Sequence, residues 1–275
     1  MPSLQKLTVN GGFPLNGEVV LSGAKNEATK LMLASLLTAE ECSLENCPDL
    51  GDTRLTQELI EAVGGKVSFS GNHVKLQTTE VKHFQVKELS RRNRIPILAI
   101  APLLHRIGKV EVPLVGGDQL GSRPVNFHIE SLQKMGARIE QRKTSYYAEA
   151  PQKLHGAMLN LAYPSVGATE TVLLTGVLAK GKTILENAAI EPEIIDLIAV
   201  LNKMGAQISY QDRTIKIEGV EKLSGITHSI MPDRNEAVSF ACLALATKGR
   251  IFVRHAQHEH LKSFLKALDN IGTSY

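Results

Sequence analysis

Apolar and polar positions follow a pattern along this chain that recurs about every seventy residues. Each block contains a stretch whose apolar residues fall on one face of a helix, and each such stretch ends in a glycine. These glycines, separated by 72, 69 and 67 residues, are Gly64, Gly136, Gly205 and Gly272. Glycine often ends a helix because it adopts the left-handed conformation without strain, so each is expected to be a helix stop. The chain is therefore predicted to be built from four repeats.

Each repeat is predicted to contain the same elements in the same order: a helix, a strand, a second helix and two strands. The first helices are expected at 26–38, 94–105, 168–179 and 236–247. The strands that follow them are expected at 42–47, 109–115, 182–187 and 250–255. The closing strand pair is clearest at 206–210 and 214–218, where apolar and polar residues alternate.

The distribution of apolar residues between helices and strands predicts which layer is buried. The first helix of each repeat is apolar nearly all round, as in 95–104, and a helix of that kind is buried. The strands alternate instead, as in 214–218, so one face of each sheet is expected to contact water. These observations favour an α+β fold turned inside out, with helices inside and sheets outside. An ordinary α/β sandwich is the alternative that periodicity leaves open.

The fourth repeat is shorter than the others. Tyr275 falls where the first strand of its closing pair is expected to begin, which would leave that strand without a partner. We therefore expect the sequence to be the N-terminal part of a longer protein.

Composition excludes several classes of protein. The chain has 275 residues, of which 43% are hydrophobic, and a formal net charge of +3, which does not call for nucleic acid. Cys42, Cys47 and Cys242 form no disulfide or metal pattern, which favours a reducing compartment. The N-terminus has no signal-peptide pattern, and no apolar run reaches the roughly 18 residues needed to span a membrane. A soluble, cytoplasmic protein without membrane partners is expected.

Three local features carry candidate chemistry. The glycine-rich loop 116–124 holds Asp118, which could deliver a proton to a ligand or be a solvated turn residue. Lys25 follows a glycine turn at a helix start, where it could bind an anion with the backbone N–H groups or lie on the surface. Arg94 begins a buried helix, so it is expected to meet an anion or pair with an acid.

Six stretches in order along the chain carry a resemblance to a known family. They are SGAKN (22–26), NCPDLGDTR (46–54), GSRPVNFHIESLQKMGARI (121–139), SVGATE (165–170), ENAAIEPEIIDL (186–197) and MPDRNEA (231–237). With these motifs the chain resembles the UDP-N-acetylglucosamine 1-carboxyvinyltransferase family, the enolpyruvyl transferases of peptidoglycan synthesis. The related 5-enolpyruvylshikimate-3-phosphate (EPSP) synthases share the fold but typically have Lys-Ser where this chain has Lys25-Asn26.

The resemblance implies an inside-out, EPSP synthase-like fold in which six repeats form two globules, with the active site between them. Residues 23–229 would form the first globule from three repeats. Residues 1–22 and 230–275 would belong to the second globule and supply one incomplete repeat of its three. This chain would therefore contain four of the six repeats.

The resemblance also implies a reaction and residues that perform it. The enolpyruvyl group of phosphoenolpyruvate would pass to the 3-hydroxyl of UDP-N-acetylglucosamine with release of phosphate, the first committed step of peptidoglycan synthesis. Lys25, Asn26 and Arg94 would contact phosphoenolpyruvate, and Lys25 would take part in catalysis. Asp118 would be the proton donor on a mobile loop, where many family members carry cysteine. Its pKa would have to rise for this role, and its carboxylate would escape alkylation by fosfomycin.

Two further stretches would bind the sugar nucleotide by resemblance. They are Arg123, Pro124, Val125, Asn126 and Phe127, and then Ser165, Val166 and Gly167. Ser165 also fits an ordinary helix cap. The family usually has aspartate where Asn126 stands and a lysine near Tyr163 and Pro164, which changes the groups available to uracil and phosphate.

No cofactor and no metal site are predicted, because His258 and His260 are two residues apart and do not share a helical face. The resemblance places the catalytic base and further arginines in the fifth and sixth repeats, beyond Tyr275. We favour the hypothesis that the chain is the N-terminal part of an active enolpyruvyl transferase. The alternatives are a non-catalytic module that binds UDP-N-acetylglucosamine and, more distantly, a pure interaction protein.

Overall fold

The computed structural model describes residues 6, 8–86, 89–90, 93–116 and 124–275. The chain divides into two compact units. The larger unit is Gly23–Met231, and the smaller unit combines Met1–Ser22 with Pro232–Tyr275.

The larger unit contains three repeats of the predicted order, helix, strand, helix, strand, strand. The first repeat comprises α1 (Lys25–Ala34), the 3-10 helix η1 (Ser35–Leu37), β2 (Cys42–Glu45), α2 (Gly51–Ala62), β3 (Lys66–Ser70) and β4 (His73–Gln77). The second comprises α3 (Ile95–Ile107), β5 (Lys109–Pro113), α4 (Asn126–Lys134), β6 (Arg138–Gln141) and β7 (Ser145–Glu149). The third comprises α5 (Val166–Gly176), β9 (Lys182–Glu186), α6 (Pro192–Lys203), β10 (Gln207–Gln211) and β11 (Thr214–Glu218).

Each repeat forms its own small sheet, in which the first strand pairs with the last. Cys42 lies opposite Leu76 in one sheet, and Leu185 lies opposite Ile215 in another. Two short strands that the sequence pattern does not predict complete these sheets. They are β8 (Met158–Asn160), which pairs with β9, and β12 (Thr227–Ser229), which pairs with β2, both in parallel. The resulting strand orders are β12-β2-β4-β3, β5-β7-β6 and β10-β11-β9-β8.

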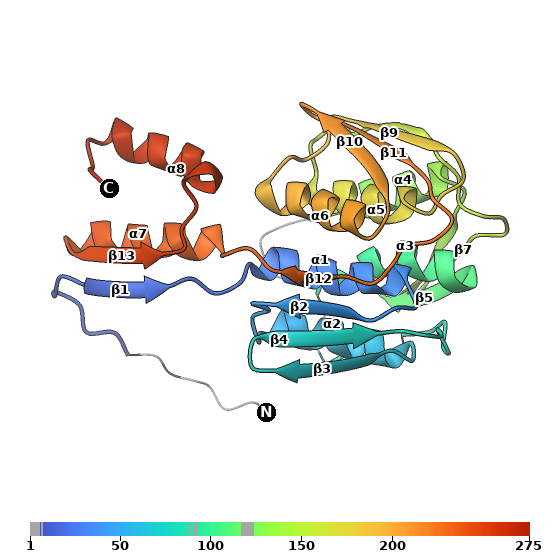
Figure 1. Ribbon diagram of the computed structural model, residues 1–275, viewed down its shortest axis with the longest axis horizontal. Coiled ribbons are helices and arrows are strands. Elements are labelled where there is room, and N and C mark those ends of the chain that lie inside the picture. The colour runs from blue at the N-terminus through green and yellow to red at the C-terminus, as the bar shows by residue number, and fades with distance from the viewer. Residues whose placement is uncertain (1–5, 7, 87–88, 91–92, 117–123) are drawn as a thin grey trace. The chain divides into compact units, whose positions relative to one another are not determined.

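The helices form the interior of this unit, and the sheets form its outer layer. In Figure 1, α1 and α6 lie between the sheet of β9 to β11 and the sheet of β2 to β4. Residues 95–104 of α3 are all buried, as the continuous apolar run predicts. Strand β11 alternates between buried and exposed residues, with Ile215 and Ile217 facing the helices. The inside-out α+β prediction is confirmed.

The four repeat glycines occupy one structural position. They directly follow the helix caps and have positive φ angles of 102°, 99°, 108° and 71° at Gly64, Gly136, Gly205 and Gly272. A side chain is strained in that conformation, which explains why glycine recurs at this point of every repeat.

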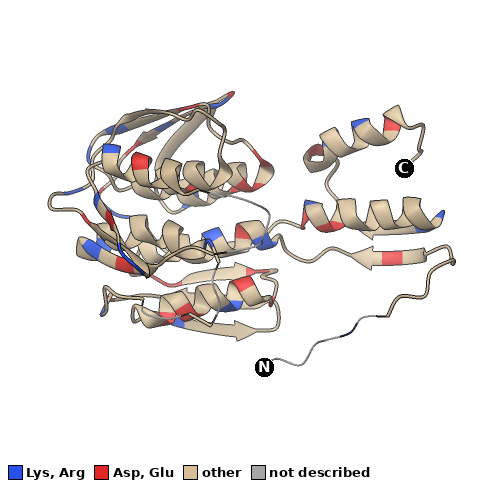
Figure 2. Cartoon of the chain, turned by 180° about the vertical axis from the view of Figure 1, so that it is seen from behind, with Lys and Arg blue, Asp and Glu red and all other residues tan. Residues whose placement is uncertain are grey.

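The smaller unit contains the fourth repeat and the N-terminal strand. Strand β1 (Asn16–Val20) pairs in parallel with β13 (Arg250–Arg254), and two helices, α7 (Arg234–Thr247) and α8 (His258–Asn270), accompany them. Figure 2 shows that α7 carries charged residues only near its ends. Its expected burial is nevertheless wrong, since Ala237 is its one buried residue. Among the described residues, only β13 and α8 pack closely on α7 within this unit, and Leu243 and Leu245 are 43% and 37% exposed.

No helix in the described part of the chain has both the length and the apolar character that crossing a membrane requires.

A buried ion pair joins two of the interior helices. Lys30 of α1 lies 3.7 Å from a carboxylate oxygen of Glu170 on α5, and the Glu170 side chain is only 4% exposed. Burial raises the pKa of Glu170 to about 7, while the charge of Lys30 opposes that rise. Lys30 therefore limits the cost of ionising a carboxylate in the interior.

Replacing Lys30 by Met should destabilise the protein more at alkaline than at acid pH. Without Lys30 the pKa of Glu170 rises further, so at pH 8 this side chain must either ionise without its cation or take up a proton, and the free energy of unfolding should fall by about 3 kcal/mol. At pH 5, below the folded pKa of about 7, Glu170 is protonated and the loss should be smaller. Urea unfolding at both pH values measures the difference.

Lys182→Met is the matched control. Its ammonium lies 3.3 Å from Glu218 in an ion pair whose side chains are 50% and 52% exposed. An exposed pair contributes about 1 kcal/mol or less, so this variant should show little loss at either pH. An equal loss at both pH values in Lys30→Met would contradict the role given to Glu170.

Candidate functional site

Three of the sequence motifs meet at the start of α1. The backbone N–H of Ala24 donates to the carbonyl of Met231 at 2.7 Å, and the amide of Asn46 donates to the carbonyl of Ile230 at 3.0 Å. Gly23 lies so close to this junction that a Cβ atom there would overlap the carbonyl oxygen of Asn46. The SGAKN glycine is therefore required by the approach of two backbone segments.

Lys25 and Asn26 lie at the N-terminal end of α1. Lys25 is the first residue of the helix, and its ammonium forms an ion pair with Asp52 of α2 at 3.1 Å. The side chain of Lys25 is 44% exposed, and Asn26 is exposed as well. A cation, an amide and the backbone N–H groups of a helix start thus share one accessible place, which suits an anionic ligand.

Arg94 joins the starts of two other helices. It is the N-cap residue of α3, and its guanidinium donates to the carbonyl of Pro124, just before α4, at 3.3 Å. Val125 is buried, whereas Asn126 is exposed and its amide donates to Glu130 at 3.4 Å. The structure therefore brings Arg94 to the 124–127 stretch, as a shared ligand site would require.

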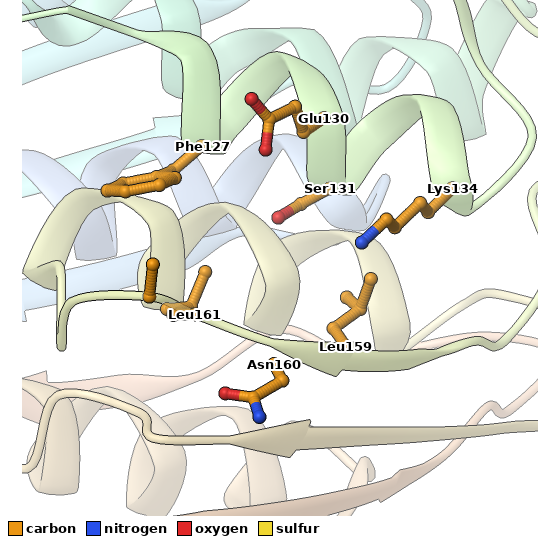
Figure 3. A pocket seen from close by; sticks show the side chains of 8 residues that line it. Phe127, Glu130, Ser131, Lys134, Leu159, Asn160 and Leu161 are labelled. Atoms are coloured by element: carbon orange, nitrogen blue, oxygen red, sulfur yellow. The ribbon is translucent and has the colours of Figure 1, made fainter.

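A small pocket begins at Phe127, in one of the two stretches that were expected to bind the sugar nucleotide. Figure 3 shows Ser131 and Lys134 of α4 facing Leu159 of β8, whereas Asn160 points away from α4. The pocket is bounded by Phe127 at the start of α4 and by Ala162 just before the Ser165 turn. Its lining residues are Phe127, Glu130, Ser131, Lys134, Leu159, Asn160, Leu161 and Ala162.

The Ser165 turn is held to α4 by close packing. Ser165 caps α5 by accepting the N–H of Ala168 at 3.3 Å, so the ordinary capping role is observed. A Cβ atom on Gly167 would come within 2.8 Å of the imidazole of His128, whose Nδ1 lies 2.7 Å from the Thr171 hydroxyl. Burial lowers the pKa of His128 to about 4, so this imidazole is neutral. Val166 is exposed beside the turn.

Two predicted site residues, Asp118 and Arg123, lie outside the described residues. The remaining ones lie at the starts of four helices: α1 carries Lys25 and Asn26, α3 carries Arg94, α4 carries Pro124 to Phe127, and α5 carries Ser165 to Gly167. Their roles as ligand contacts stay predictions.

The sequence as a whole matches a known family. A model of the EPSP synthase (3-phosphoshikimate 1-carboxyvinyltransferase) family matches residues 9–274. The chain belongs to this family. Its fold agrees, since the enolpyruvyl transferase NikO from Streptomyces tendae superposes with a TM-score of 0.73 at 23% identity, covering 84% of this chain and 55% of NikO. EPSP synthase from Acinetobacter baumannii superposes with a TM-score of 0.66 at 18% identity, covering 84% and 53%.

More similar relatives carry the name UDP-N-acetylglucosamine 1-carboxyvinyltransferase. The protein of that name from Chlamydia pneumoniae is 46% identical over 99% of this chain and 60% of its own length. The one from Protochlamydia amoebophila is 42% identical over 98% of this chain and 60% of its own length. This chain therefore spans about 60% of the length of these curated relatives.

Beside α1 lies a cluster that sequence reasoning missed. It consists of Glu27 of α1, Asp196 of α6 and His228 of β12, and we call it the Glu27 cluster. Within the described ranges, it is the one group of three or more His, Cys, Asp or Glu side chains whose ligand atoms lie close enough together to hold a metal ion. Its three members lie far apart in the sequence, so no local motif could have predicted the cluster.

Replacing Gly23 by Ala should disrupt the junction at the start of α1. The added Cβ would overlap the carbonyl oxygen of Asn46, and relieving the overlap requires the backbone to move. Overpacking of this kind typically costs 1 to 3 kcal/mol, so we expect the free energy of unfolding to fall by about 2 kcal/mol. Chemical denaturation measures it. At Gly11 nothing lies within 4 Å of an added Cβ atom, so Gly11→Ala is the control and should leave the free energy of unfolding unchanged. An unchanged free energy of unfolding in Gly23→Ala would show that the two backbone segments do not pack this closely.

Proposed function

We propose that this chain belongs to an enolpyruvyl transferase that moves the enolpyruvyl group of phosphoenolpyruvate to the 3-hydroxyl of UDP-N-acetylglucosamine. The carrying observation is the identity of 46% over 99% of the chain to a relative named UDP-N-acetylglucosamine 1-carboxyvinyltransferase. We place this reaction in the cytoplasm, as the first committed step of peptidoglycan synthesis. The meeting of three sequence motifs around Lys25 supports the proposal.

The proposed chemistry requires an acid, a base and several cations. A proton is added to C3 of the enol, and the sugar hydroxyl loses its proton and attacks C2. C3 then gives up a proton as the bond from C2 to the phosphate oxygen breaks, which restores the double bond and releases phosphate. We assign Lys25, Asn26 and Arg94 to the binding of phosphoenolpyruvate, since cations at helix starts suit its phosphate and carboxylate. We assign Asp118 as the acid, with its pKa raised by desolvation when ligands bind.

The sugar nucleotide is assigned to the surface around α4 and α5. Arg123, Pro124, Val125, Asn126 and Phe127 would contact it from one side, and Ser165, Val166 and Gly167 from the other. The pocket bordered by Phe127 and Ala162 supports this assignment, since it adjoins the first stretch at Phe127 and ends shortly before Ser165. The amide of Asn126 can both donate to and accept from uracil, where a carboxylate can only accept.

We further propose that residues 1–22 and 230–275 begin a second globule of this enzyme. The exposed apolar surface of α7 supports the idea, because a helix with few polar positions is stable when other elements cover it. The resemblance assigns the catalytic base to that globule, and the relatives are longer than this chain.

The activity test is release of phosphate from phosphoenolpyruvate in the presence of UDP-N-acetylglucosamine. The assay uses the natural polypeptide that contains these 275 residues. Lys25→Met should lower kcat/KM by about 100-fold, because a charge contact to the reacting anion is lost. Lys153→Met, which removes an ammonium from an exposed pair with Glu221, is the control and should leave the rate unchanged.

Two results would contradict the proposal in different ways. Binding of UDP-N-acetylglucosamine in calorimetry without phosphate release would indicate the non-catalytic binding module. Neither binding nor release would show that both substrates are wrong.

A cysteine at position 118 should change the response to fosfomycin. An ionised thiol is the nucleophile that fosfomycin alkylates, and a carboxylate is not attacked in this way. The natural protein should therefore keep its phosphate release in fosfomycin, and Asp118→Cys should lose it with time. Phosphate release after preincubation with the drug measures the effect, and Cys242, an exposed thiol already present, serves as an internal control. Inactivation of the natural protein would contradict the assignment of Asp118.

A further inference from the structure

The Glu27 cluster joins three elements of the larger unit. Nε2 of His228 lies 2.7 Å from a carboxylate oxygen of Asp196 and 3.5 Å from Oε1 of Glu27. The side chain of Glu27 is fully buried, whereas those of His228 and Asp196 are 10% and 24% exposed. One imidazole thus faces two carboxylates, one from α1 and one from α6.

The cluster is bonded to the backbone that precedes the smaller unit. Oε2 of Glu27 accepts the N–H of Met231 at 3.1 Å, and the carbonyl of Met231 accepts the N–H of Ala24 at 2.7 Å. Met231 is therefore held through both of its backbone polar groups by the first turn of α1. The residues between these two anchor points are Lys25 and Asn26.

The charges of the cluster favour an imidazolium between Asp196 and Glu27. The hydrogen bond to Asp196, followed by the nearby Glu27 carboxyl group, raises the pKa of His228 to about 9. Burial opposes the ionisation of Asp196, but the hydrogen bond from His228 and the neighbouring Glu27 outweigh it and lower its pKa. Burial raises the pKa of Glu27 to about 8, and Asp196 adds to that rise, whereas His228 opposes it. Lys203 is the other charged group that acts on Asp196.

A metal ion fits this cluster less well than a proton does. Two ligands of one zinc ion, each about 2.0 to 2.1 Å from a tetrahedral centre, lie about 3.3 Å apart. The 2.7 Å between His228 and Asp196 is shorter than that and matches a charge-assisted hydrogen bond.

We propose that Glu27, Asp196 and His228 are positioning residues that fix the first turn of α1, and with it Lys25 and Asn26, against Met231. The imidazolium bonds to Asp196 and faces Glu27, and Glu27 in turn bonds to the backbone N–H of Met231. The part of this inference that concerns ligand binding rests on the proposed function, because it takes Lys25 and Asn26 as contacts of phosphoenolpyruvate.

The structural part is tested by magnetic resonance and hydrogen exchange on the natural chain. The ring of His228 should titrate above pH 8, and its contribution to stability should be complete below about pH 6.5 and lost as the pH rises through about 9. The amides of Ala24 and Met231 should exchange about tenfold faster in His228→Gln. Glu27→Gln keeps an acceptor for Met231 and should show a smaller effect than Glu27→Ala.

His105→Gln is the matched control for a general loss of stability. His105 is another half-buried histidine of this unit, and its Nε2 lies 2.7 Å from the carbonyl of Thr175 rather than beside a carboxylate. This variant should leave the exchange of Ala24 and Met231 unchanged relative to their neighbours. An ordinary pKa for His228, or equal exchange in His228→Gln and His105→Gln, would overturn the proposal. So would zinc binding by the natural protein that Glu27→Gln abolishes.

The ligand part is tested by the KM for phosphoenolpyruvate in the phosphate-release assay. In His228→Gln the KM for phosphoenolpyruvate should rise about tenfold at pH 7, with a smaller change in kcat, because Lys25 and Asn26 are displaced from the positions in which they bind this substrate. The ratio of the KM of His228→Gln to the KM of the natural protein should approach one above pH 9, where His228 of the natural protein also loses its proton. A ratio independent of pH would overturn the positioning role. Absence of phosphate release from the natural protein would instead refute the proposed function, and the exchange and titration results would then decide on the cluster alone.

Discussion

The burial of three apolar helices is the constraint on which the rest of this structure depends. Helices α1, α3 and α5 are buried along most of their length, so they are stable only when other elements surround them. The three small sheets provide that cover, each with one face toward the helices and the other toward water. The exposed residues of α1 and α5 are Asn26 and Val166, at the helix starts, where candidate ligand contacts lie.

The few charges that do enter the interior are compensated in pairs or in groups. Lys30 faces Glu170 between α1 and α5, and His228 faces Glu27 and Asp196 between β12, α1 and α6. In both places burial raises the pKa of a glutamate, and a neighbouring cation limits the rise. Both groups include α1, so the helix that carries Lys25 is tied to its neighbours by directional contacts as well as by packing.

Sequence patterns predicted most of the fold because they report on local physics. The continuous apolar run 95–104 could only belong to a buried helix, and the repeat glycines required a left-handed conformation. Strands β8 and β12 were missed because three residues at a sheet edge show too little alternation to be recognised. The burial of α7 was wrongly expected because apolar composition does not say which elements are there to cover a helix. Motif resemblance named Lys25, Arg94 and Ser165 as candidates, whereas the Glu27 cluster joins residues that no sequence spacing connects.

The pairing of β12 with β2 sets an order of events during synthesis. Thr227 pairs with Ser43, so the edge of the first sheet stays open until nearly the whole larger unit has been made. At about 5 to 20 residues per second, the ribosome would need roughly ten to forty seconds to supply that strand. During this interval the nascent first repeat presents an unpaired strand edge, the feature that most readily pairs with other chains. The speed of translation and the binding of chaperones to the first repeat therefore affect how much folded protein a cell obtains.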